Sequence, residues 1–267
     1  MDKIRLGNVQ VSRFMLGSNP FCGFSHQGGT RDRAMMHYYT TARVKETFRQ
    51  AEALGVDTLI ARADPHIMRL LMEYWDEGGR IQWVAQTCPG LGDSPRIARA
   101  AVENGAKAVF IHGGVMDYTV ARNDLADPVA AIDIIRAAGL PVGIAGHSPK
   151  VFRWAEQTTF DVDFYMCSYY DAAPRDKSPE KSRDQPEVFR EEDRAAMAAT
   201  IQTLSRPAIH YKVMAAGRND PAGALNHAAR AMRDGDGVCV GIFTGDGPDM
   251  VAQDVRLFEQ AWAARKA

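Results

Sequence analysis

Cysteine is scarce in this chain, and its spacing excludes two of its common uses. The sequence of 267 residues contains four cysteines, none of them in a CxxC pair: Cys22, Cys88, Cys167 and Cys239. A disulfide framework and a cysteine-based zinc module are therefore not expected. Free thiols of this kind are typical of a reducing compartment, so we predict a cytoplasmic protein.

Long apolar runs and an excess of one charge are also absent. No stretch reaches the roughly 18 apolar residues of a membrane-spanning helix, and the first residues lack the apolar core of a secretory signal. The 32 Lys and Arg residues nearly balance the 33 Asp and Glu residues, which argues against a nucleic-acid or membrane-surface partner. We expect a small-molecule substrate instead, and the sequence leaves open whether the chain forms a homo-oligomer.

Eight short apolar runs recur along the chain, and segments with helical periodicity separate them. The runs are FMLGSN, DTLIAR, QWVAQT, AVFIHG, PVGIAG, FYMCSYY, AIHYKV and VCVGIFTG. Buried parallel strands have this continuous apolar character, and eight strand–helix units form a (β/α)8 barrel, or TIM barrel, of about 250 residues. We therefore predict an α/β fold in which residues 1–267 form a single (β/α)8 barrel domain with a short N-terminal β-hairpin, turning at Gly7 and Asn8.

The connections between the runs carry recognisable signals. Asp or Ser followed by Pro opens several predicted helices, as at Asp64 and Ser148. The stretch 171–187 differs, because it is charged, rich in proline and without apolar periodicity. A loop of this length in a barrel is usually functional, so we expect a lid or a partner surface here.

Most of the runs end at a polar or ionisable residue, and in a barrel those ends meet at the active-site face. His112 ends the fourth run, and Lys212 lies late in the seventh. Strand alternation puts His210 and Lys212 on one face, which we predict to point into the barrel. A histidine and a buried lysine suit proton transfer, so His112 and Lys212 are the predicted proton-handling pair.

Other residues at the strand ends complete the predicted site. His147, Tyr169 and Asp64 are expected to assist catalysis, although Asp64 before a proline also suits a helix cap. The glycine-rich stretches AAGRND and TGDGPD follow the last two runs, where barrels commonly bind phosphate. Substrate binding is assigned to four residues: Asn19, Gln86, Arg218 and Gly245.

The sequence leaves metal binding open without predicting a ligand set. HxH and HExxH motifs are missing, and no glutamate stands at the end of a predicted strand. His66, His112, His147 and Cys167 would come from different strand ends if a divalent ion did bind.

Several stretches resemble aldo-keto reductases. IRLGNVQVSRFMLGSNPFCG is similar to the opening of that family, a β-hairpin followed by the first strand, and TTARVKETFRQAEALGVDTL is similar to its first helix and second strand. His112 in VFIHGG falls where the family has its fourth-strand histidine. FYMCSYY resembles its sixth strand, and IFTGDGPDMVAQDVRLFEQA resembles its last strand and the following helix. The resemblance covers most of the chain and implies the same barrel, with NADPH as the cofactor.

The resemblance does not extend to the family's catalytic tetrad. Ile60 stands near the position of its Asp, the next tyrosine is Tyr74 within a predicted helix, and Gln86 or Thr87 stands near its Lys. Only His112 matches, so the proton donor for carbonyl reduction is missing. We therefore predict an enzyme that performs acid/base chemistry, by elimination/hydration, isomerisation or hydrolysis, on a small polar substrate that is sugar-like or bears a carbonyl. An NADPH-dependent reductase with a rearranged acid and a non-catalytic binding barrel are the alternatives, and the cofactor stays undetermined.

Overall fold

The computed structural model of the chain describes residues 1–158, 160–173, 175, 178–180 and 186–265. Eight parallel strands close into a barrel in the order β10-β3-β4-β5-β6-β7-β8-β9, which confirms the predicted fold. The strands are β3 (Phe14–Gly17), β4 (Thr58–Arg62), β5 (Gln82–Gln86), β6 (Ala108–Ile111), β7 (Val142–Gly146), β8 (Phe164–Ser168), β9 (Ala208–Tyr211) and β10 (Gly237–Gly241).

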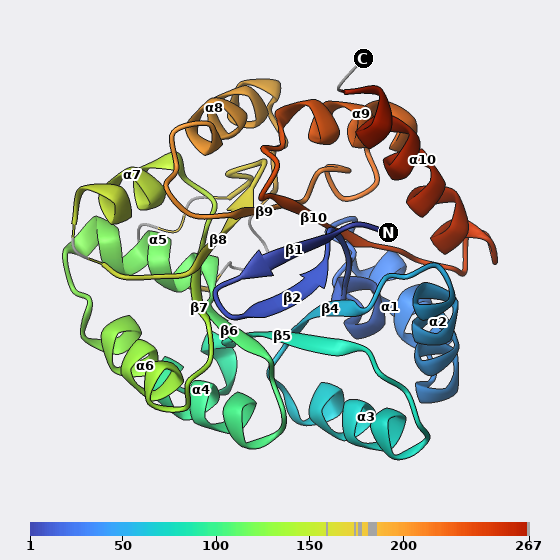
Figure 1. Cartoon of the computed structure of the whole chain (residues 1–267), viewed down its shortest axis with the longest axis horizontal. Helices are drawn as coiled ribbons and strands as arrows, with labels where there is room; N and C mark the ends of the chain where they lie inside the picture. The colour runs from blue at the N-terminus through green and yellow to red at the C-terminus, as the bar shows by residue number, and fades with distance from the viewer. Residues whose placement is uncertain (159, 174, 176–177, 181–185, 266–267) are drawn as a thin grey trace.

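Helices surround the barrel (Figure 1). They are α1 (Gly29–Tyr38), α2 (Thr41–Ala53), α3 (Pro65–Asp76), α4 (Ser94–Glu103), α5 (Gly113–Arg122), α6 (Ala126–Ala137), α7 (Pro149–Gln157), α8 (Glu191–Ile201), α9 (Pro221–Ala231) and α10 (Met250–Ala264), with the 3-10 helices η1 (Asn19–Cys22) and η2 (Pro89–Leu91). Within the described parts of the chain, none of these helices combines the length and the apolar character needed to cross a membrane.

The inside of the barrel is filled by apolar side chains from alternating strand positions. These residues are Met15, Ile60, Val84, Ala108, Phe110, Ala145, Phe164, Met166, Ile209 and Cys239. The predicted hairpin, β1 (Lys3–Leu6) with β2 (Val9–Ser12), lies across the N-terminal end of the barrel and adds further apolar side chains to this core (Figure 1). The C-terminal end is therefore the end that remains for a functional site.

Polar side chains at the helix starts act as the sequence predicts. The carboxylate of Asp64 accepts the N–H of Ile67 at 2.9 Å and caps α3, and Ser148 caps α7. At α4 the cap is Asp93, one residue before the predicted start at Ser94. These capping hydrogen bonds hold the first turn of each helix in place close to the C-terminal end of the strand that precedes it.

Two helices, α1 and α5, lie in segments whose sequences carry little helical signal. α1 buries only Met35 and so lacks the apolar stripe that marks a helix. α5 begins at Gly113 and Gly114, and glycine is a poor helix former. The predicted lid, 171–187, lies between β8 and α8, and residues 174, 176–177 and 181–185 of it lie outside the described residues.

Candidate active site at the C-terminal end of the barrel

Six side chains line the C-terminal opening of the barrel, which we call the mouth. Each lies two positions beyond a residue of the interior core, so strand alternation points it inward. They are Arg62, Gln86, His112, His147, Ser168 and Tyr211. The predicted residues His112, His147 and Gln86 are therefore brought together at one end of the barrel.

Asp117 and His147 form the tightest polar contact in the mouth. The Nδ1 atom of His147 lies 2.7 Å from Oδ2 of Asp117, which belongs to α5. The carboxylate also accepts the backbone N–H groups of His147 at 3.1 Å and of Ser148 at 3.2 Å. Gly113 packs against the ring, because a Cβ there would lie 2.9 Å from Cε1 of His147. The imidazole is therefore held in one orientation.

Burial sets the charge state of this pair. It lowers the pKa of His147 well below the ordinary histidine value, and the charges of Lys212 and Arg175 act in the same direction. Burial also raises the pKa of Asp117 to about 6, against the backbone hydrogen bonds it accepts. At pH 7 the carboxylate is then ionised, and the neutral imidazole donates its Nδ1–H to it. The Nε2 lone pair is left as the acceptor, 3.5 Å from the hydroxyl of Tyr211.

His112 is neutral as well, but it has the opposite tautomer. The Nδ1 atom of its ring accepts the backbone N–H of Gly114 at 3.1 Å and so caps α5. The backbone N–H of His112 donates to Thr87 Oγ1 at 2.9 Å. Burial lowers the pKa of His112 well below the ordinary value, and the neighbouring His147 and Arg175 lower it further. A neutral ring that accepts at Nδ1 carries its proton on Nε2. His112 is therefore a hydrogen-bond donor to whatever enters the mouth.

Lys212 reaches the same cluster, although not by the predicted strand alternation. β9 ends at Tyr211, and Lys212 has a left-handed backbone with φ of 58°. Its positive charge lowers the pKa of both His112 and His147, so it acts electrostatically on the mouth. The prediction that His210 shares this face is wrong, because Tyr211 is the inward residue and the change of chain direction at Lys212 ends the alternation.

Tyr169 does not lie in the mouth, which corrects the prediction that it stands beside His112 and His147 and assists catalysis there. It is fully buried between the barrel and the outer helices, and its hydroxyl lies 2.9 Å from Nδ1 of His210. His210 in turn contacts Asp236 at 3.5 Å. The physical reason is strand alternation: Ser168 points into the barrel, so the side chain of the next residue points away from it. Tyr211 supplies the tyrosine of the mouth instead.

Asp64 and Asn19 lie at the rim of the mouth. Asp64 caps α3, and its Oδ2 atom lies 3.7 Å from Nε of Arg62. Asn19 is exposed, and its side-chain amide lies 3.3 Å from Nε2 of His26. His26 also pairs with Glu187 at 2.8 Å, which joins the loop after β3 to the segment between β8 and α8.

The turns after β9 and β10 do not fit the phosphate groups of a nicotinamide dinucleotide. The guanidinium of Arg218 donates to two loop carbonyls, at 3.1 and 2.9 Å. A Cβ on Gly245 would lie 2.4 Å from the ring of Phe243, so that ring covers the glycine. In the same turn Asp246 forms an ion pair with Arg31. The guanidinium of Arg218 is therefore already used within the protein, and the turn after β10 carries a carboxylate that would repel a phosphate.

Metal ligands are not grouped in the described parts of the chain. Within those parts, no three His, Cys, Asp or Glu side chains lie in an arrangement that could hold an ion. The histidines of the mouth instead use their Nδ1 atoms within the protein, on Asp117 and on the N–H of Gly114.

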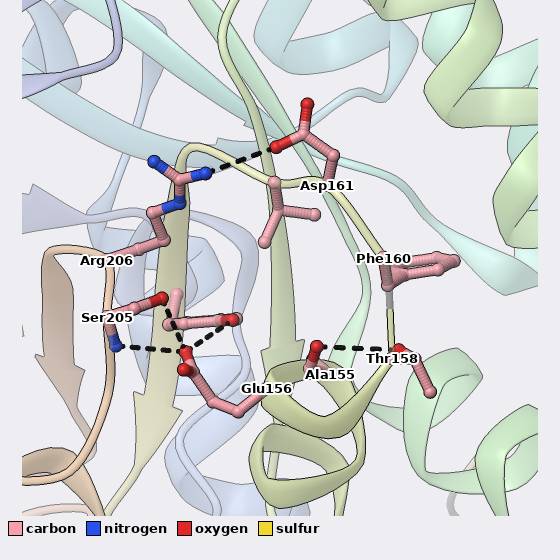
Figure 2. A pocket seen from close by; sticks show the side chains of 9 residues that line it. Ala155, Glu156, Thr158, Phe160, Asp161, Ser205 and Arg206 are labelled. Carbon is pink, nitrogen blue, oxygen red and sulfur yellow. Dashed lines mark hydrogen bonds and ion pairs between the residues drawn. The ribbon is translucent and has the colours of Figure 1, made fainter.

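A surface depression at the other end of the barrel is separate from the mouth. Figure 2 shows it between the end of α7 and the segments that enter β8 and β9, with a volume of about 200 Å³. Its carboxylate, Glu156, is held by the N–H of Ser205 at 3.0 Å and by the hydroxyl of Tyr165 at 2.9 Å, and Asp161 pairs with Arg206. Its charged groups thus satisfy one another.

No protein-family model matches the chain, and no curated protein matches its sequence. Solved structures with the same fold do match. A Pseudomonas aeruginosa protein described as an aldo-keto reductase has a TM-score of 0.65 at 16% identity, over 97% of this chain and 95% of that chain. An aldo-keto reductase from Bacillus halodurans has a TM-score of 0.59 at 12% identity, over 99% and 96%.

A third similar structure comes from a different class of enzyme. It is the N-acetylmannosamine-6-phosphate 2-epimerase from Clostridium perfringens, with a TM-score of 0.51 at 10% identity, over 91% of this chain and 93% of that chain. The aldo-keto-reductase-like barrel predicted from the sequence is therefore confirmed as a fold. At these identities the likeness assigns no reaction, because one barrel supports many chemistries.

Five residues in or beside the mouth were not assigned to the site from the sequence: Arg62, Asp117, Ser168, Arg175 and Tyr211. Asp117 lies in the unpredicted helix α5, and Arg175 lies in the segment between β8 and α8. Tyr211 lies in a predicted strand, but was placed on the opposite face. Strand alternation gives a usable signal for Arg62, Ser168 and Tyr211, because each lies two positions beyond a residue of the apolar interior.

Proposed function

We propose that the protein is an enzyme that carries out acid/base chemistry at the C-terminal mouth of the barrel. Its substrate would be small and polar, sugar-like or carrying a carbonyl, and its reaction an isomerisation or an elimination/hydration. The observation that supports this most is the Asp117–His147 pair, in which a buried carboxylate fixes a neutral imidazole with Nε2 as the acceptor. The same base acting on a water molecule would give the hydrolysis alternative.

The neighbouring groups supply the rest of the proposed proton transfer. His147 Nε2 takes a proton from the carbon next to the substrate carbonyl, and the electron pair of that C–H bond moves toward the carbonyl oxygen. His112 donates a hydrogen bond from its Nε2–H to this oxygen and keeps its proton. The positive charge of Lys212 stabilises the negative charge that develops on the oxygen. In an isomerisation, His147 returns the proton to the former carbonyl carbon, while the proton of the neighbouring hydroxyl moves to the first oxygen and the new carbonyl forms. In an elimination, the carbonyl re-forms as the bond from the next carbon to its hydroxyl breaks, and His147 gives its proton to that hydroxyl, which leaves as water. Atoms and charges balance without a cofactor.

The pH dependence of turnover tests the role of Asp117. The pKa of this carboxyl is raised to about 6, so kcat/KM is expected to rise as pH increases through about 6, where Asp117 ionises. Asp117→Asn should remove this limb and lower kcat/KM by about 10²–10⁴-fold, because Asn imposes the wrong tautomer on His147. The measurement is a rate profile from pH 4.5 to 8.5 on a panel of small 2-oxo and 2-hydroxy acids, including sugar acids.

Stability separates this role from a structural one. A raised folded-state pKa means that the contribution of Asp117 to stability is present below pH 3.8 and is lost as pH rises through about 6. Asp117→Asn should therefore keep or raise the free energy of unfolding at pH 7. Asp93→Asn, the same change at the exposed cap of α4, serves as the control and should leave the profile intact. An unchanged acidic limb in Asp117→Asn would refute the assignment.

The fold supports a second candidate, an NADPH-dependent reductase of the aldo-keto type, since two of the similar structures carry that description. Fluorescence titration with NADPH discriminates between the two. We expect no saturation below about 1 mM, because Arg218 donates to loop carbonyls and the turn after β10 carries the negative charge of Asp246. Binding in the micromolar range, abolished by Arg218→Gln, would favour the reductase. Ligand-induced stabilisation without any turnover would favour a non-catalytic binding barrel.

A further inference from the structure

We infer that the substrate is an anion, and that its carboxylate or phosphate group binds Arg175 at the start of α5. The inference rests on the proposed function, because it places this group beside His112 and His147. It adds the chemical class of the substrate and a binding residue that the sequence did not indicate.

The side chain of Arg175 is buried, and its only ion pair within the described parts of the chain is a long one, to Asp117. Its side chain is 8% exposed, and its buried Nε atom has no hydrogen-bond partner. In this ion pair Nε lies 4.0 Å from Oδ2 of Asp117, beyond hydrogen-bond distance, and that oxygen is bound to His147. The charge of Arg175 also lowers the pKa of Asp171, against the larger effect of burial, which raises it. A buried cation is costly unless it is paired and hydrogen-bonded. A bound substrate anion would supply the hydrogen-bond partner that the Nε atom of Arg175 lacks.

The start of α5 presents a second positive element to the same point. The side chain of Arg175 packs on this first turn, since a Cβ on Gly114 would lie 3.2 Å from its Cδ. The N-terminus of a helix carries partial positive charge, so a guanidinium there is unfavourable by itself. An anion between the two would be stabilised by both, through charge-assisted hydrogen bonds from Arg175 and the dipole of α5.

Two other arginines near the mouth, Arg62 and Arg218, differ from Arg175. Arg62 donates from Nε to Sγ of Cys88 at 3.1 Å, and its guanidinium lies 4.7 Å over the ring of Phe24. Arg218 donates to loop carbonyls. Their guanidinium groups are held by the protein, whereas the Nε atom of Arg175 has no hydrogen-bond partner among the described residues, and its charge lowers the pKa of both His112 and His147.

Calorimetric titration with small probes tests the inference. The probes are glycolate, inorganic phosphate and, as the uncharged counterpart of glycolate, ethylene glycol. We expect saturable binding of at least one of the two anions to the wild type and none of ethylene glycol. Arg175→Gln should weaken the binding at least about tenfold, and Arg175→Lys should restore part of it. Preference for glycolate would identify a carboxylate, and preference for phosphate a phosphoryl group.

Arg206→Gln is the matched control, since Arg206 lies at the opposite end of the barrel and is exposed. It should bind the anions as the wild type does. The inference is overturned if the wild type binds neither anion, or if Arg175→Gln binds them as tightly as the wild type. It can fail separately from the proposed function: an enzyme that requires His147 for turnover, yet binds anions independently of Arg175, would retain the function and lose this inference.

Discussion

Replacing His147 by Asn is expected to lower kcat by about 10²–10⁴-fold, the usual contribution of a general acid/base side chain. The variant lacks the Nε2 acceptor, which we propose takes the proton of the substrate. Its shorter side chain can still donate a hydrogen bond to Asp117, so the mouth should keep its arrangement. The measurement is the steady-state rate on members of the acid panel that the wild type converts.

The control for this variant is His66→Asn, at an exposed position in α3. It makes the same chemical change outside the mouth and should leave kcat within about twofold of the wild type, as surface changes usually have small effects. A His147→Asn enzyme whose kcat equals that of this control would show that His147 takes no part in the chemistry.

Replacing Asp236 by Ala is expected to lower the free energy of unfolding at pH 7 by about 3–5 kcal/mol, the usual result of breaking a buried ion pair. Asp236 is fully buried. It accepts the N–H of Ala208 at 2.8 Å, pairs with Arg233 at 2.8 Å and contacts His210 at 3.5 Å. Its removal leaves these donors unpaired where β9 enters the barrel. Urea denaturation measures the change.

The direction in which the free energy of unfolding changes with pH gives a second test of the role of Asp236. Burial alone would raise the pKa of Asp236, but hydrogen bonds from His210 and Arg233 lower it to about 2. Its contribution to stability is therefore present above pH 3.8 and lost as pH falls through about 2. Asp234→Ala, at an 81% exposed carboxylate two residues earlier, should cost less than about 1 kcal/mol. Equal effects of the two substitutions would contradict the assignment.

The barrel could be predicted because its signals are local and repeated. Each buried strand is a continuous apolar run, as in FYMCS of β8, and capping residues such as Asp64 mark where helices begin. The helix α5 could not be predicted in the same way. It starts with two glycines, and what justifies them is tertiary: side chains at Gly113 and Gly114 would collide with His147 and with the carbonyl of Pro179.

The sequence predicts part of the site. The wrong placements come from counting the alternation of side chains along a strand from the wrong residue. His112 and His147 stand directly after short strands, so counting from the fold places them correctly. Tyr169 was misplaced because two adjacent tyrosines follow β8, and only strand parity shows that the preceding Ser168 is inward. Asp117 and Arg175 act from a helix and a long connection, whose positions depend on packing rather than on periodicity.

Incorporation of solvent deuterium is the measurement that bears most directly on proton transfer by His147. The wild type and the His147→Asn variant are incubated in D₂O with the panel of 2-oxo and 2-hydroxy acids, and the proton signal of the carbon next to the carbonyl is followed by NMR. The account predicts that this signal decays with the wild type and at least about a hundredfold more slowly with the variant. Exchange at the same rate in both proteins would contradict it.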